Sequence, residues 1–552
     1  MPVTKRPLFP GFTKTERSLL ARSAKGRGGT IEVPRFPFRP QESPIVQAVR
    51  RRAIGEQEER QSPRTVQEYY SGEQGHVVLV PTMNRPRKLA KLISSIHENV
   101  RKFNYRKPIT VVVVDDSSEN EANQNRKKMS QFMEKSPSNV RIQYYNRADQ
   151  QQLLSEMAQR GGGDVQKFIY EHESKKGYGG VRNMALLFGV RHSNPNDIVT
   201  FLDDDVTLKN LVVEERHGKR SLRIRHVSDY FGNIDRMFSR PGVDVAGGGY
   251  TIDNHFGEFN NIQIGIRAIE HFFAQAREHR PDEVCDNTFK EIWGQSPSRG
   301  TKYREGLELV EKLTRDMIAG KQRFNLGMFN PNMYHTPYLA GGNLSMRARI
   351  MTEIPYPLMA GTRGEDIVFT ALAYFRGKHP VWFYPNPVSH RKDSLDTSIG
   401  GGQRNVFRHA ALEAAPFGII GTMKALSYRG NLVKRLRSNH PEMHSLLQDE
   451  IAGQEKWIDQ EYVSDFERRL QNIRKYLDTE AWYNEGKERQ VKERIGKMVD
   501  YIEDEVKKLR HKTSEVLRDQ RLTKVLEEYP HRMDRWRELV EIAKYSRLQQ
   551  AA

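Results

Sequence analysis

Apolar and polar positions alternate in blocks along the middle of the chain. Apolar, largely β-branched runs of strand length occur at 76–80, 109–114 and 198–202. Between the first two runs, leucine and isoleucine recur at helical spacing over 87–100. A strand, a helix and a second parallel strand form a βαβ unit. The pattern therefore predicts an α/β fold with an open, mostly parallel, Rossmann-like sheet.

Further elements follow the same alternation. We expect a strand at 140–145, a helix at 151–160 and a charged hairpin at 208–225. Beyond about residue 403 the strand pattern stops, and charged helical patterns take over. The predicted organisation is a basic, Pro/Gly-rich arm at 1–70, a sheet domain at 71–402 with an insertion at 206–335, and a helical region at 403–552.

Carboxylates follow two of the predicted strands. Asp115 and Asp116 end one strand, and Asp203, Asp204 and Asp205 end another. The carboxyl ends of parallel strands share one edge of a sheet, where ligands bind. Adjacent aspartates repel one another, and Mg²⁺ or Mn²⁺ relieves that repulsion. The alternative for the aspartate triplet alone is a solvated turn or a helix N-cap.

A basic, glycine-rich stretch at 175–185 opens a predicted helix. Glycine lets the backbone approach a phosphate, and a helix N-terminus attracts negative charge. The stretch matches neither G-x-G-x-x-G nor a P-loop, so these two nucleotide-binding motifs are excluded.

Composition limits the class of protein. The formal net charge of +19 favours an anionic partner, such as a nucleotide, a phosphorylated acceptor, nucleic acid or an acidic membrane surface. A generally solvated basic surface is the alternative. The single cysteine, Cys285, excludes an intrachain disulfide and a Cys-based zinc site. With no signal-peptide pattern at 1–6 and no apolar run long enough to span a membrane, we expect a cytoplasmic protein, soluble or peripheral to a membrane.

Six short segments occur along the chain at predicted strand ends or helix starts: 81–85, 115–117, 177–185, 203–205, 341–347 and 365–366. Each segment alone is a weak signal. Their order resembles that of the motifs of the GT-A-fold, family 2-like glycosyltransferases, over about residues 76–395.

The resemblance implies a metal-dependent enzyme that moves a sugar from a nucleotide-diphosphate sugar to an acceptor hydroxyl. It implies a metal, Mn²⁺ or Mg²⁺, on Asp205 and on His390, which is placed like a histidine that completes the metal site in several GT-A enzymes. Asp366, with Glu365, is the implied catalytic residue at the acceptor. Asp204 is expected to point away from its neighbours, because alternate strand residues face opposite sides. The implied donor-binding residues are Thr82, Asn84, Arg85, Asp115, Asp116, Lys176, Gly177, Arg182, Asp203, Asp204, Gly342 and Asn343.

Several alternatives stay open on sequence alone. Family 2 enzymes commonly invert the anomeric centre with the aspartate as base, whereas histidine-bearing relatives retain it. The acceptor, the sugar and the nucleotide are not identified, and an anionic acceptor is one option. A nucleic-acid-binding protein on a similar sheet, or transfer to a modified DNA base, is the competing function. A nucleotidyltransferase does not fit 81–85, which lacks the glycine-rich signature such enzymes carry after the first strand.

Overall fold

The computed structural model describes most of the sheet domain and most of the C-terminal region. The described residues are 74–171, 176–216, 219–226, 228–252, 257–276, 307–308, 311–312, 314–315, 333–339, 341–359, 364–375, 379–384, 386–390, 419–428, 432–437, 441–479, 487–518 and 520–546. The predicted arm at 1–70 lies outside these ranges, as does much of the predicted insertion. Among the described helices, none is long and apolar enough to cross a membrane.

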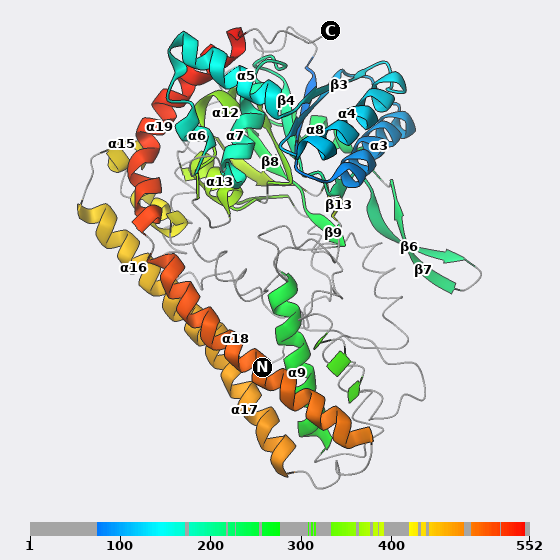
Figure 1. Ribbon diagram of the computed structural model, residues 1–552, viewed down its shortest axis with the longest axis vertical. Coiled ribbons are helices and arrows are strands. Elements are labelled where there is room, and N and C mark those ends of the chain that lie inside the picture. The colour runs from blue at the N-terminus through cyan, green and yellow to red at the C-terminus, as the bar shows by residue number, and fades with distance from the viewer. Residues whose placement is uncertain are drawn as a thin grey trace.

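An eight-stranded sheet lies between helices in the upper part of the view in Figure 1. Its strands, in spatial order, are β10 (Tyr334–His335), β12 (Val381–Phe383), β8 (Val245–Gly247), β11 (Asn343–Arg347), β4 (Ile198–Leu202), β1 (His76–Thr82), β2 (Ile109–Asp115) and β3 (Val140–Tyr145). β1 pairs in parallel with β2 and β4, and β2 with β3, whereas β11 runs antiparallel between β4 and β8. The α/β fold with a mostly parallel sheet is thereby confirmed.

Helices cover both faces of this sheet. One face carries α3 (Pro86–Phe103), α4 (Glu119–Glu134) and α8 (Tyr230–Phe238); the other carries α5 (Arg147–Met157), α7 (Gly177–Gly189), α12 (Ala348–Glu353) and α13 (Glu365–Phe375), with η2 (Ala158–Gly162) and α6 (Gln166–Ile169) following α5. On β1, Val78 and Val80 pack toward the first face, while Val77 and Leu79 pack toward the second. Burial on both faces explains why the strands are continuous apolar runs rather than alternating ones.

The helix expected at 151–160 begins earlier, at Arg147. Asn146 caps it, because the Asn146 side chain accepts from the Asp149 N–H while the Asp149 carboxylate accepts from the Asn146 N–H. This capping box satisfies two donors that would otherwise lack partners at the helix start. The helical period of apolar residues cannot reveal such a polar first turn.

A second, three-stranded sheet lies beyond the carboxyl edge of the large one. It contains β5 (Val206–Thr207), β13 (Val388–His390) and β9 (Tyr250–Ile252). β13 runs antiparallel to β5, with His390 opposite Val206, and parallel to β9. The hairpin predicted at 208–225 is confirmed as β6 (Asn210–Arg216) paired with β7 (Lys219–Arg225).

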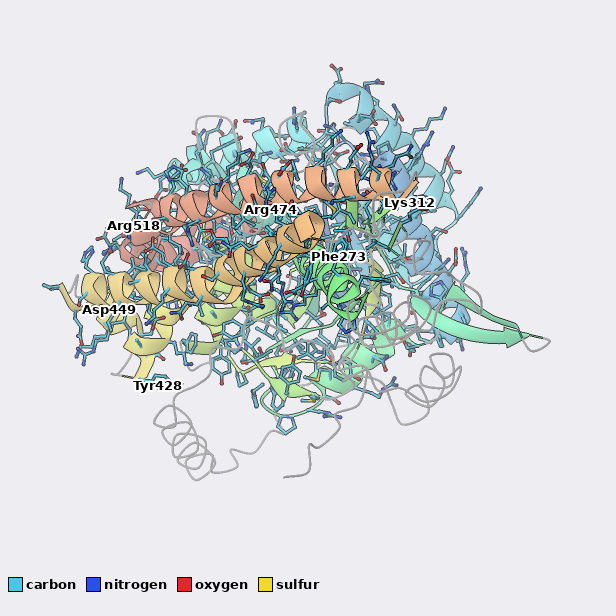
Figure 2. The ribbon with its side chains drawn as sticks, turned by 90° about the horizontal axis from the view of Figure 1, so that it is seen from below. Phe273, Lys312, Tyr428, Asp449, Arg474 and Arg518 are labelled. Carbon is cyan, nitrogen blue, oxygen red and sulfur yellow. The ribbon has the colours of Figure 1, made fainter. Side chains whose placement is uncertain are left out.

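The C-terminal region is helical, as predicted. Its elements are α15 (Leu432–Arg437), α16 (Pro441–Ile458), η3 (Asp459–Val463), α17 (Ser464–Thr479), α18 (Lys487–Leu517) and α19 (Gln520–Tyr545). The long helices α16, α17 and α18 extend away from the sheet together with α9 (Gly257–Ala276) (Figure 1). Phe273 of α9 (Figure 2) stacks on Tyr476 of α17, with ring centroids 5.9 Å apart.

The last helix, α19, returns to the sheet domain. Its Trp536 is fully buried and donates through Nε1 to the Met351 carbonyl at 2.7 Å. Tyr529 is also buried, and its hydroxyl donates to the Pro355 carbonyl at 2.9 Å. Apolar residues of α19 belong to the same buried cluster as one face of the sheet. The C-terminal region therefore packs on the sheet domain and contributes to its core.

A buried histidine joins two elements at the sheet edge opposite the carboxyl ends of the strands. His379 Nδ1 lies 3.1 Å from Asp244 Oδ2, and His379 Nε2 lies 3.2 Å from Glu353 Oε2. Arg349 and Arg347 also pair with Asp244. Burial lowers the pKa of His379, but the two carboxylates outweigh it and raise this pKa above 6.5.

We predict that this pairing makes stability depend on pH. Because the folded-state pKa of His379 is raised, its stabilisation is fully present below pH 6.5 and is lost as pH rises through the folded-state pKa. His379→Gln should remove about 1 kcal/mol of stability near pH 6 and less near pH 9. Chemical unfolding at both pH values measures the difference.

His444→Gln is the matched control, because His444 pairs with Glu527 but is itself exposed, and Glu527 is partly exposed. This control should show no such pH-dependent loss. Equal losses for His379→Gln at the two pH values would contradict the assignment.

Candidate active site

Asp205 and His390 meet at the carboxyl edge of the sheet. Asp205 Oδ1 lies 3.1 Å from His390 Nε2, and both side chains are almost completely buried. The contact arises because His390 pairs with Val206, the residue after Asp205. Arg85 and Lys88 lie 3.5 and 3.8 Å from Asp205 Oδ2. Burial opposes ionisation of Asp205, but His390 and these cations hold its pKa below the ordinary value.

The neighbouring carboxylate, Asp204, turns toward the first strand. It accepts from Thr82 Oγ1 at 2.7 Å and from Arg85 Nη1 at 3.0 Å. Burial raises the pKa of Asp204 to about 7, against the opposing effect of Arg85. The prediction that Asp204 points away from its neighbours is wrong, because Arg85 Nη1 lies 3.0 Å from Asp204 Oδ1 and 3.5 Å from Asp205 Oδ2. The strand β4 ends at Leu202, so the alternation of strand side chains does not extend to Asp204 and Asp205.

Arg182 connects three segments on the other side of the site. Its Nη2 donates to Asp203 Oδ1 at 3.2 Å, its Nε to Glu365 Oε1 at 3.4 Å and its Nη1 to the Gly341 carbonyl at 3.3 Å. The guanidinium lies against the rings of Phe201 and Tyr356, 5.3 and 5.5 Å from their centroids. A buried cation held in this way fixes the positions of the carboxylates around it.

Asp366 lies at the first turn of α13, next to Glu365. Its two oxygens accept from the Gly341 N–H at 2.5 Å and from the Ile367 N–H at 2.8 Å. Burial raises the pKa of Asp366. A Cβ on Gly341 would lie 2.8 Å from both Asp366 Cβ and the Arg182 guanidinium, so only glycine allows this close approach. The structure therefore gathers Asp203, Arg182, Glu365 and Asp366 around one glycine turn.

Asp115 has a structural role in place of the implied nucleotide contact. It is fully buried, and it accepts from the Ser117 N–H at 2.9 Å, Asn125 Nδ2 at 2.8 Å and the Tyr144 hydroxyl at 2.5 Å. These internal donors already occupy both of its oxygens. Burial of this carboxylate is tolerated because the donors satisfy it.

Asp116, by contrast, is partly exposed at the same edge. Its Oδ1 lies 2.8 Å from Lys176 Nζ and 3.1 Å from Arg147 Nε. Lys176 is buried and also donates to Gln150 Oε1 at 2.6 Å. The structure thus brings Asp116 and Lys176 together, and it adds Arg147 and Gln150 to the group.

Two of the named residues have left-handed backbone conformations. Asn84 has φ of 56° and Gly177 has φ of 61°. Asn84 links the loops after β1 and β2, since its N–H donates to Ser117 Oγ and its Oδ1 accepts from the Ser118 N–H. A Cβ on Gly177 would lie 2.1 Å from the Glu171 carboxyl group. The Glu171 carboxylate therefore lies beside Gly177 at the start of α7.

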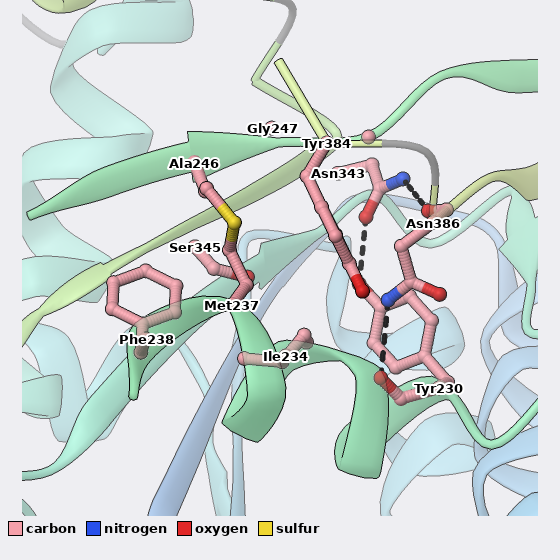
Figure 3. A pocket seen from close by; sticks show the side chains of 11 residues that line it. Tyr230, Ile234, Met237, Phe238, Ala246, Gly247, Asn343, Ser345, Tyr384 and Asn386 are labelled. Atoms are coloured by element: carbon pink, nitrogen blue, oxygen red, sulfur yellow. Dashed lines mark hydrogen bonds between the residues drawn. The ribbon is translucent and has the colours of Figure 1, made fainter. Parts of the chain in front are cut away.

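Asn343 also has an internal role. It is buried beside a small cavity of about 10 Å³ (Figure 3), where its Oδ1 accepts from the Tyr230 hydroxyl at 2.6 Å. Its Nδ2 donates to the Asn386 carbonyl at 2.9 Å. Its neighbour Gly342 lies on the site side, because a Cβ there would be 2.2 Å from Asp203 Oδ2. Asn343 therefore supports the site from behind.

The sequence patterns missed several residues of this edge. Lys88 lies one helical turn after the 81–85 loop. This spacing could have indicated that its side chain reaches the same edge of the sheet as that loop. Arg147 and Gln150 lie in the first turn of α5, whose start was predicted too late. Tyr250 follows the glycines at 247–249, and nothing in the local sequence indicates where its ring lies.

Within the described ranges, no group of three or more His, Cys, Asp or Glu side chains is arranged to hold a metal. The pair Asp205–His390 offers one carboxylate and one imidazole, donors that suit Mn²⁺. A metal bound there would need its remaining ligands from a bound substrate and water.

No protein-family model matches the chain, and no curated protein matches its sequence. Among solved structures, the chain is similar to mannosyl-3-phosphoglycerate synthase from Rubrobacter xylanophilus, at 12% identity over 71% of this chain and 80% of that one, with a TM-score of 0.28. It is also similar to mouse xyloside xylosyltransferase 1 (12% identity, 47% and 79% of the two chains, TM-score 0.19). A third similar structure is the mannosyltransferase Ktr4p from S. cerevisiae in complex with GDP (11% identity, 62% and 74% of the two chains, TM-score 0.18). Scores this low do not establish a shared fold, and a function must be argued from the geometry of the site.

Adjacent carboxylates should differ sharply in their effect on stability. Asp115→Asn places an amide N–H₂ against donors of Asn125 and Tyr144, and we expect it to cost about 2–4 kcal/mol of unfolding free energy. Asp116→Asn is the matched variant and should cost less than about 1 kcal/mol. Chemical denaturation of both variants checks this, and similar losses would show that Asp115 is not the structural member of the pair.

Proposed function

We propose that the chain is a metal-dependent glycosyltransferase that moves a sugar from a nucleotide-diphosphate sugar to an acceptor hydroxyl. The observation that carries this proposal is the buried contact between Asp205 and His390, 3.1 Å apart. These residues come from distant parts of the chain and meet where α/β sheets bind ligands. The ordered motifs that resemble family 2-like GT-A enzymes lie around the same edge and support the proposal.

The leaving diphosphate carries several negative charges. A metal held by Asp205 and His390 would neutralise the charge that develops on it. Arg85 and Lys88 face the same carboxylate, and their N–H donors are placed to meet a phosphate oxygen that arrives there.

On the nucleotide side, we assign the donor contact to Asp116 rather than Asp115. Asp116 is partly exposed, while Lys176 and Arg147 hold its carboxylate in place. A carboxylate so placed accepts hydrogen bonds from ribose hydroxyls or from a base N–H.

On the acceptor side, Asp366 is the residue we assign to the reacting hydroxyl. Its raised pKa brings its proton affinity closer to that needed of a general base at neutral pH. Glu365 and Arg182 hold the turn that positions it. In an inverting reaction Asp366 would take the acceptor proton, and in a retaining one it would orient the acceptor or the sugar.

Thermal unfolding with a panel of UDP- and GDP-sugars, with and without Mn²⁺, tests this function. We expect one nucleotide class to stabilise the chain only with Mn²⁺, by about 2.7 kcal/mol at a hundredfold excess over its Kd. Asp205→Ala and His390→Ala should each abolish the Mn²⁺-dependent part, because these two side chains are the ligands that we assign to the metal.

His192→Ala is the matched control, since His192 is partly buried and contacts the Tyr145 hydroxyl at 2.6 Å, in a different contact network. This variant should keep the Mn²⁺-dependent stabilisation. If no nucleotide sugar stabilises the native chain, the proposal is wrong. If oligonucleotides stabilise it instead, with a steep dependence on salt, nucleic-acid binding replaces the proposal.

A further inference from the structure

A pocket of about 370 Å³ lies in the C-terminal region, between the helical segment α16–η3 and helix α18. These helices lie side by side where they extend away from the sheet domain (Figure 1). The volume falls in the range of pockets that bind small molecules, roughly 300–1,000 Å³. None of the residues that line the pocket belongs to the site at the carboxyl edge of the sheet.

An irregular helical turn forms part of the pocket wall. The helix α16 passes without a break into η3, a π-helical turn, and then into α17. Single π-helical turns inside α-helices are rare, and they occur frequently at functional sites. The first and last residues of η3, Asp459 and Val463, both line the pocket. The irregular turn therefore coincides with the pocket.

A buried hydroxyl at the pocket has no hydrogen-bond partner among the described residues. Thr513 of α18 lines the pocket and is 2% exposed, and its Oγ1 makes no hydrogen bond there. A threonine in a helix commonly donates to the carbonyl three or four residues before it, but Thr513 does not. Because an unpaired buried hydroxyl costs free energy, a ligand oxygen that pairs with Thr513 would relieve that cost.

The charged side chains that line the pocket balance one another. Two are carboxylates, Glu455 and Asp459, and two are cations, Lys456 and Arg510. Asp459 accepts from Arg510 Nε at 2.7 Å, and Glu455 accepts from Ser514 Oγ at 2.8 Å. An anion in this pocket would meet the two carboxylates, and a cation would meet the two basic groups. The pocket therefore favours a neutral ligand.

Glu455 keeps its negative charge and its place at the pocket. Arg518 (Figure 2) donates to both of its oxygens, at 2.9 and 3.0 Å, and thereby lowers the pKa of Glu455. Each carboxylate oxygen has two lone pairs, so Glu455 can accept a further hydrogen bond from a ligand. Groups that donate to a carboxylate and also accept from a cation or a threonine are hydroxyls.

We propose that this pocket binds a neutral saccharide. Hydroxyls of the saccharide donate to Glu455 and Asp459. Other oxygens of the same molecule accept from Arg510 and Thr513, and Val463 offers an apolar contact to the C–H face of the ring. The site lies outside the proposed active site and needs neither a metal nor a nucleotide.

Saturation-transfer difference NMR on the full chain tests this site. The neutral probes are D-glucose, D-mannose and maltose, and the charged probes are malonate and choline. Metal-free buffer without nucleotide keeps the proposed metal-dependent site out of the measurement. We expect saturable transfer to at least one of the sugars and none to malonate or choline.

Thr513→Val removes the hydroxyl and keeps a β-branched side chain. It should weaken sugar binding about fivefold, as expected for one lost hydrogen bond between neutral groups. It should not lower the thermal unfolding midpoint of the free chain, because this hydroxyl has no partner to lose among the described residues. Thr523→Val is the matched control, since Thr523 lies on α19 and does not line the pocket. It should leave sugar binding unchanged.

A second variant tests the pocket by filling it. Ala452 lines the pocket from α16 and is exposed, so a larger side chain is tolerated there without a change in the core. Ala452→Leu should abolish saturable transfer to the sugar while the unfolding midpoint stays within about 2 °C of the native value.

Three results would overturn the proposal. The first is that none of the neutral sugars binds the native chain, which would leave the pocket to water. The second is sugar binding that Thr513→Val and Ala452→Leu both leave unchanged, which would place the sugar elsewhere. The third is transfer to malonate or choline that Ala452→Leu abolishes, which would make the pocket a site for a charged ligand. None of these results bears on the glycosyltransferase function, which is tested with Mn²⁺ and nucleotide sugars.

Discussion

Compensation of negative charge at one edge of the sheet is the constraint on which the rest of the site depends. Parallel strands deliver carboxylates to this edge, and buried carboxylates repel one another unless cations or N–H donors face them. Arg182 compensates the negative charge of Asp203 and Glu365. Arg85 and Lys88 compensate that of Asp204 and Asp205. The negative charge of Asp205 is also compensated by the buried imidazole of His390. Imidazole is a side chain that commonly binds metal ions.

The same edge explains the roles of distant elements. β11 runs antiparallel beside β4, so the turn before it reaches the carboxyl edge together with the ends of the parallel strands. The small sheet then places β13 and β9 above that edge. Behind it, α19 binds the segment around Met351 and Pro355, next to the ring of Tyr356 that packs on Arg182. The last helix, α19, therefore belongs to the framework that holds the site.

The fold was predictable because buried parallel strands are continuous apolar runs, and their ends mark the binding edge. The sequence could not predict which carboxylates are left to bind a ligand and which are satisfied by hydrogen bonds within the protein. Asp115 and Asp116 are neighbours in sequence, and only the folded positions of Asn125 and Tyr144 show that Asp115 is satisfied internally. The approach of His390 to Asp205 follows the family resemblance, not a local pattern, because it depends on the register between β13 and β5.

We propose that Asp205 and His390 hold one metal ion together. Pulsed electron paramagnetic resonance of Mn²⁺ bound in the presence of a nucleoside diphosphate detects a directly coordinated imidazole nitrogen. We expect a nitrogen coupling in the native chain that disappears in His390→Ala. Mn²⁺ that binds with the nucleotide but shows no nitrogen coupling, or an unchanged coupling in His390→Ala, would contradict it.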